Sequence, residues 1–136
     1  MVAAHPFRND LAQRPWQRHR EKLTVEQACQ REFFRLVDAI EVANGWSTEE
    51  EVSFAGEVSR QLGMRGTGGS DAHAPFQVGY CVTLFEDWIH SEEDLVRALK
   101  RGRFSVEDRR DSHRKGPGHI YWGPGEEPWA KEGKGL

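Results

Sequence analysis

The feature that most constrains the fold of this chain is the alternation of short apolar segments with amphipathic helical segments. In the helical segments apolar side chains recur every three to four residues, whereas the apolar segments are short runs that include branched and aromatic residues. The predicted helices are 24–36, 48–62 and 91–102, and the predicted strands are 2–4, 39–43, 64–67, 78–85 and 104–106. Strands that alternate with helices of this length favour an α/β layer or barrel with a parallel sheet.

Local capping signals support the helix starts. In a capping box, a hydroxyl at the helix start and an acidic or amide side chain three residues later bond each other's backbone N–H groups. The predicted boxes are Thr24 with Gln27, Ser47 with Glu50, and Ser91 with Asp94. Gly63 is predicted to end the second helix in a left-handed conformation, which glycine adopts without steric cost.

Composition narrows the class of protein and of partner. The 136 residues, 37% hydrophobic and 30% charged, fit one modest domain. A formal net charge of -3 gives no electrostatic case for nucleic acid or an anionic membrane as the main partner. The chain has no apolar run near the roughly 20 residues of a membrane span, and its first residues lack the pattern of a secretory signal. Cys29 and Cys81 form no CxxC pair, so we expect buried thiols in a reducing cytoplasm.

The end of the chain differs in composition from the rest. Glycine and proline recur from about residue 108 onward, with mixed charges and no hydrophobic periodicity. Such a composition is typical of flexible segments because it cannot bury enough apolar surface to offset the lost chain entropy. The predicted organisation is therefore a folded portion over 1–107 and a mobile tail over 108–136.

Metal-type ligands follow the predicted strand ends. His5 follows the first strand, Asn44 the second, and Asp71 and His73 the third. The carboxyl ends of parallel strands meet at one edge of a sheet, so these side chains should converge there. A carboxylate oxygen and an imidazole nitrogen are common ligands of divalent transition metals. Asp71 and His73 are therefore candidate metal ligands; the alternative is an Asx turn beside a surface histidine.

Three further residues are candidates for supporting roles. Arg8 could hold a phosphate oxygen with its guanidinium, or it is a solvated loop residue. Glu41 lies in mid-strand and either orients a ligand residue from behind or faces solvent. Asn44 is first of all a turn former before Gly45 and otherwise a supporting group of the same kind. The glycine-rich segment 66–69 could cradle a phosphate, although glycines that permit a tight turn also explain it.

These motifs resemble the C-terminal part of a metal-dependent phosphoesterase of the PHP (polymerase and histidinol phosphatase) family. The resemblance runs from Val2 to about Val106 and is carried by 4–8 (AHPFR), 40–45 (IEVANG) and 69–73 (GSDAH), with support from 78–80 (VGY). It implies part of a distorted (β/α)7 barrel and a cluster of Zn, Mn or Fe ions. His5, Asp71 and His73 would each serve as metal ligands, and they would tend to serve different ions.

The resemblance also implies an activity and its partners. A metal-bound hydroxide would hydrolyse a phosphomonoester or phosphodiester, in a phosphorylated small molecule or at a nucleic-acid end. The opening HxH ligands of the family have no counterpart in this sequence, so the 136-residue chain alone is expected to be inactive. It would then need a missing N-terminal half or self-association. The alternative is a non-catalytic PHP-like remnant or subunit that serves as an association module.

Overall fold

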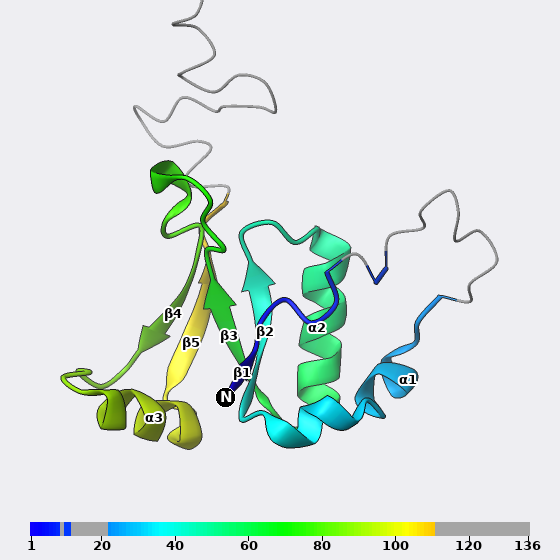
Figure 1. Cartoon of the computed structure of the whole chain (residues 1–136), viewed down its shortest axis with the longest axis horizontal. Coiled ribbons are helices and arrows are strands. Elements are labelled where there is room, and N and C mark those ends of the chain that lie inside the picture. The colour runs from blue at the N-terminus through cyan, green and yellow to red at the C-terminus, as the bar shows by residue number, and fades with distance from the viewer. Residues whose placement is uncertain (9, 12–21, 111–136) are drawn as a thin grey trace, which may run out of the picture.

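The computed structural model describes residues 1–8, 10–11 and 22–110, which form a mixed α/β fold (Figure 1). Three parallel strands make one sheet in the order β1–β2–β3. Their bounds are Val2–Ala3 for β1, Ala39–Asn44 for β2 and Arg65–Gly69 for β3. The parallel sheet confirms the coarse α/β prediction. Its strands end at a common edge, as the candidate site requires.

The first predicted helix is interrupted. Instead of one helix over 24–36, the chain forms α1 (Val25–Cys29) and a short 3-10 helix, η2 (Glu32–Leu36). The predicted capping box of Thr24 and Gln27 is present. Arg31 between the two helices is extended, with φ -64° and ψ 121°. This extended residue separates the two helices, and Phe34 is buried in η2.

The second helix, α2 (Glu49–Gln61), begins one residue later than its sequence signal indicates. Its capping box joins Thr48 and Glu51 rather than Ser47 and Glu50. The shift arises because the Ser47 backbone N–H is bonded to the Asn44 carbonyl, which keeps Ser47 in the preceding turn. Gly63 follows the helix with φ +64°, as predicted. It permits the left-handed turn that leads directly into β3.

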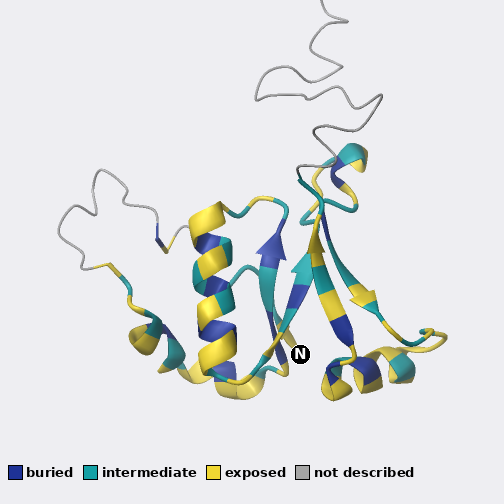
Figure 2. Ribbon diagram, turned by 180° about the vertical axis from the view of Figure 1, so that it is seen from behind, coloured by how far each residue is buried: buried dark blue, intermediate teal, exposed yellow. Residues whose placement is uncertain are grey.

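The core lies between the parallel sheet and the helices α1, η2 and α2, and Figure 2 shows the buried residues on their facing sides. Phe7 is 1% exposed and follows β1. Its ring packs edge-to-face on Phe54 at 4.9 Å and tilted on Phe34 at 6.0 Å between centroids. The Arg31 guanidinium lies 5.5 Å from the same ring. Phe7 therefore anchors the loop after β1 to the core.

The remaining strands depart from the prediction of a fully parallel sheet. β4 (Cys81–Phe85) and β5 (Phe104–Asp108) pair antiparallel and are joined by α3 (Glu92–Arg101). Strand β4 begins at Cys81, so 78–80 is not part of it. The Thr83 hydroxyl donates to the Gly68 carbonyl and accepts from the Gly68 N–H, both at 2.9 Å. A side chain thus takes the place of a backbone ladder between β3 and β4, and the described strands form no closed barrel.

Two predictions concern features beyond this core. The proposed mobile tail lies almost entirely in 111–136, outside the described residues, whereas β5 extends to Asp108. Among the described residues, no helix has the length and apolar character needed to cross a bilayer.

We predict that Phe7→Ala lowers the free energy of unfolding by about 3–5 kcal/mol. The variant loses a buried ring and leaves a cavity between Phe34 and Phe54. Urea denaturation followed by circular dichroism measures the change. Leu36→Ala is the control because Leu36 is 73% exposed, and it should change stability by no more than about 0.5 kcal/mol. Equal stability of the two variants would contradict the anchoring role of Phe7.

Candidate functional site

The candidate site lies at the carboxyl edge of the parallel sheet. The chain leaves β1 through His5, ends β2 at Asn44 and passes from β3 into Asp71 and His73. Neighbouring strands pair in parallel, so these segments lie at the same end of the sheet, as predicted (Figure 1). The glycine-rich segment 66–69 belongs to β3 and its ladder with β2, and this placement explains it as part of a strand rather than a phosphate-binding loop.

Glu41 joins the three strand ends. Its Oε2 accepts the backbone N–H of His5 at 2.7 Å and the Asn44 side-chain amide at 3.0 Å. A Cβ atom at Gly69 would collide with Glu41 Oε1, so only glycine leaves room for the carboxylate there. The β2–β3 register shifts between Glu41 and Ala43, an irregularity of the kind that re-aims side chains near functional sites. Glu41 thus holds the backbone of His5, which has φ +29°.

Asn44 fixes the loop that follows β2. Its side chain is 2% exposed, and its Oδ1 accepts the Trp46 backbone N–H at 2.9 Å. Gly45 donates its N–H to the Gly69 carbonyl at 3.1 Å, and a Cβ at Gly45 would collide with the Ser70 carbonyl. The loop after β2 and the segment after β3 are therefore in direct backbone contact. Asn44 forms the turn, as predicted, and its amide also bonds Glu41, whereas its role in supporting a metal ligand stays a prediction.

Arg8 pairs with Asp71. Arg8 Nη1 lies 2.6 Å from Asp71 Oδ2, and the side chains are 28% and 20% exposed. Oδ2 itself is fully buried and accepts no hydrogen bond of good geometry, so charge attraction alone compensates it. Asp71 has φ +48°, an uncommon conformation for a non-glycine residue and frequent at functional sites. The sequence identified both residues but did not predict that they contact each other.

His73 has a defined orientation. Its Nδ1 lies 2.7 Å from the Asp71 backbone carbonyl. A carbonyl oxygen only accepts, so Nδ1 donates this hydrogen bond, and Nε2 is the ring nitrogen that remains for another ligand. Gln77 Oε1 accepts the His73 backbone N–H at 2.7 Å. The Trp46 ring meets the imidazole nearly perpendicular, at 5.6 Å between centroids. Sequence reasoning missed both Gln77 and Trp46, which no motif marks.

The donor atoms suit a divalent metal ion in kind but not in number. Asp71 and His73 supply an oxygen and a nitrogen, and the bond from His73 Nδ1 to a carbonyl is the usual support of a metal-binding imidazole. However, the described residues contain no group of three or more histidine, cysteine, aspartate or glutamate side chains able to hold one ion. A catalytic zinc ion takes about three protein ligands. A complete centre would therefore need ligands from outside the described residues.

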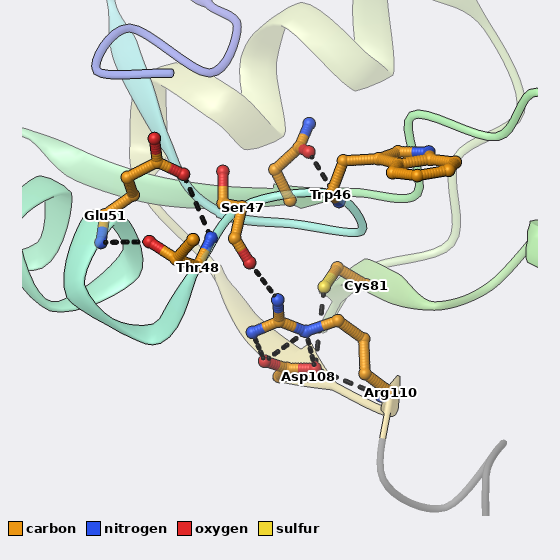
Figure 3. Close-up of polar contacts among 8 residues, drawn as sticks. Trp46, Ser47, Thr48, Glu51, Cys81, Asp108 and Arg110 are labelled. Atoms are coloured by element: carbon orange, nitrogen blue, oxygen red, sulfur yellow. Dashed lines mark hydrogen bonds and ion pairs between the residues drawn. The ribbon is translucent and has the colours of Figure 1, made fainter. Parts of the chain in front are cut away.

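A second polar cluster ties β5 to the loop before α2 (Figure 3). Arg110 binds the Asp108 carboxylate through Nε and Nη2, at 2.9 Å and 2.5 Å, and its Nη1 donates to the Ser47 carbonyl. The Arg110 hydrogen bonds lower the pKa of Asp108. Cys81 Sγ lies 3.6 Å from Asp108 Oδ1, and burial, with a smaller effect of Asp108, raises the pKa of that thiol to about 12. Sequence analysis did not identify this cluster, because its members are distant in the chain.

The fold and the site together define a mixed α/β domain that carries metal-type ligands and an arginine at the carboxyl edge of its parallel sheet. Residues 49–104 match the family model described as PHP-associated. The match confirms the resemblance to the C-terminal part of a PHP family protein over these residues, which include Asp71 and His73 but not His5, Arg8 or Glu41. No curated protein and no solved structure matches the chain.

We predict that Glu41→Ala lowers the free energy of unfolding by about 1–3 kcal/mol, because the His5 N–H and the Asn44 amide lose their acceptor. Glu41→Gln keeps one acceptor oxygen and should lose less. Urea denaturation of both variants measures the difference, and amide NMR shifts of His5 report the local change. If alanine and glutamine cost the same, the carboxylate does not hold the strand ends together.

We predict that the Cys81 thiol of the native protein resists labelling by an aromatic disulfide reagent at pH 8. Burial keeps this thiol protonated. The folded pKa of about 12 exceeds the usual value of 9.0, so the unfolded state loses its proton first as the pH rises. Stability should therefore fall between about pH 9 and 12, with a slope that is absent in Cys81→Ala. Cys29, which is only partly buried, should label first. Rapid labelling of Cys81 in the native state would contradict this burial.

Proposed function

We propose that this chain contributes ligands to the metal centre of a PHP-type phosphoesterase that hydrolyses a phosphomonoester or phosphodiester. The observation that carries the proposal is the hydrogen bond between His73 Nδ1 and the Asp71 backbone carbonyl, which leaves His73 Nε2 and the Asp71 carboxylate as candidate donors to a metal ion, within a segment that matches a PHP-associated family model. Asp71 and His73 would bind metal directly, and His5 would serve a neighbouring ion. The metal could be Zn, Mn or Fe, because oxygen and imidazole ligands accept each.

The chain's own residues would position these ligands. A divalent ion held by Asp71 and His73 would activate water for attack on phosphorus and would neutralise charge on the phosphoryl group. Glu41 fixes the backbone at His5, and the carbonyl of Asp71 fixes the tautomer of His73. Arg8 pairs with Asp71 through Nη1. The other N–H groups of its guanidinium could donate hydrogen bonds to a phosphate oxygen. Arg8 would thus connect the metal ligand to the phosphate.

The alternative is a non-catalytic association module. It is favoured by the absence of a three-residue metal-binding group among the described residues. In this case the domain would bind a partner or a second copy through exposed apolar side chains such as Leu36 and Val78, which are 73% and 66% exposed. The two functions differ in whether the purified chain binds metal through Asp71.

Metal analysis of the purified chain by mass spectrometry tests the proposed function. We predict near-stoichiometric Zn, Mn or Fe that is lost in Asp71→Ala, because this substitution removes a ligand oxygen. Asp87→Ala is the matched control, since Asp87 is a surface carboxylate in an ion pair with Arg103, away from the candidate site. It should keep the metal.

Hydrolysis of an aryl phosphate and size-exclusion chromatography are measured on the same samples. Metal that survives in Asp71→Ala would contradict the ligand assignment. Metal-free, inactive protein that elutes as a dimer or larger would overturn the proposal for this chain in favour of the association module.

A further inference from the structure

We propose that Trp46 is the platform on which a planar aromatic ring of the substrate stacks, so that the site selects phosphate esters that carry such a ring. This inference rests on the proposed function, because it places the ring beside the same phosphate site. It adds a residue that determines specificity and a chemical class of substrate, which the metal ligands alone do not indicate.

The backbone at Trp46 is held rigidly. Asn44 Oδ1 accepts the Trp46 N–H at 2.9 Å, and the preceding Gly45 is bonded to the Gly69 carbonyl at 3.1 Å. The following Ser47 donates its N–H to Asn44 at 3.1 Å, and its carbonyl accepts from Arg110 (Figure 3). A mobile loop could fold its indole onto the protein surface. This loop instead presents the indole in one place.

The side chain itself remains accessible. Trp46 is 50% exposed although it lies next to a buried asparagine and two glycine-mediated backbone contacts. Figure 3 shows its indole extending away from the Asp108–Arg110 pair. An aromatic side chain that stays in water does not contribute the stability that its burial would provide, so stability of the fold does not explain the exposed position of this ring. An exposed aromatic ring of this kind is well suited to stack on a planar ligand.

The position of Trp46 connects the ring to the phosphate chemistry. Its indole contacts the His73 imidazole edge-to-face at 5.6 Å and 81°. A perpendicular contact covers less of either ring face than a stacked contact does, in agreement with the exposure of Trp46. His73 in turn is bonded to Asp71, which pairs with Arg8. An ester whose phosphate lies by Arg8 would therefore have its remainder close to Trp46.

Trp88 provides an internal comparison. It is 87% exposed and also lies near a histidine, His90, at 6.5 Å and 18° between the rings. Its loop joins β4 to α3 and lies at the opposite end of the fold from the ends of β2 and β3 (Figure 1). The two tryptophans thus share a type of environment and differ in their distance from the candidate site.

Equilibrium dialysis of the full chain tests the inference with three probes: adenosine 5′-monophosphate, ribose 5-phosphate and adenosine. The nucleotide should bind more tightly than the sugar phosphate. Trp46→Leu should weaken nucleotide binding by about five- to a hundredfold, the range of base stacking on an aromatic side chain. It should leave ribose 5-phosphate unchanged, whereas Trp46→Phe should retain most of the affinity. Trp88→Leu is the matched control and should bind every probe like the unmodified chain.

The adenosine arm separates this inference from the proposed function, because stacking of the bare ring requires no metal ion. If the chain binds no metal but still binds adenosine through Trp46, the proposed phosphoesterase function is overturned and the stacking role of Trp46 is supported. Equal binding of nucleotide and sugar phosphate would overturn the platform, as would undiminished nucleotide binding by Trp46→Leu. If Trp46→Leu also weakens ribose 5-phosphate, Trp46 supports His73 structurally, and the platform is overturned as well.

Discussion

The contacts of the Glu41 carboxylate are the interaction on which the arrangement of the candidate site depends. Three parallel strands end at one edge, but strand pairing alone does not fix the loops beyond it. Glu41 accepts hydrogen bonds from the loop after β1 and from the last residue of β2, and it occupies the space left by Gly69 in β3. One partly buried acceptor therefore fixes the three strand ends relative to one another. This arrangement is maintained because a donor that is removed from water and left without an acceptor costs free energy.

The core and the site are connected through the loop after β1. Phe7, which lies between His5 and Arg8 in the sequence, is buried in the core. The Arg8 N–H donates to the His5 carbonyl at 3.1 Å and closes the turn. Hydrophobic packing thereby places the arginine that pairs with Asp71. On the other side, the Thr83 hydroxyl joins β4 to β3 without a backbone ladder. The parallel sheet therefore ends at β3, and the candidate site lies on this sheet rather than on the β4–β5 pair.

Local signals in the sequence predicted much of the secondary structure. The capping box at Thr24, the glycine stop at Gly63 and the strand before Asn44 are all present. The errors have tertiary causes. The predicted first helix breaks at Arg31, and the second capping box moves to Thr48 because the Asn44 carbonyl holds the Ser47 N–H in the turn. The prediction that β4 and β5 join a parallel sheet was wrong, because hydrophobic patterning does not encode whether neighbouring strands pair parallel or antiparallel.

The sequence by itself determined the kinds of atoms at the site and their place after strand ends, because turn residues and strand periodicity are local properties. It led to His5, Asp71 and His73 as candidate ligands, which remain predictions. Only the tertiary structure decided which groups meet: Arg8 with Asp71, Trp46 with His73, and Glu41 with the loop after β1. These contacts join residues far apart in the chain, so their geometry arises from packing, which no local pattern of residues specifies.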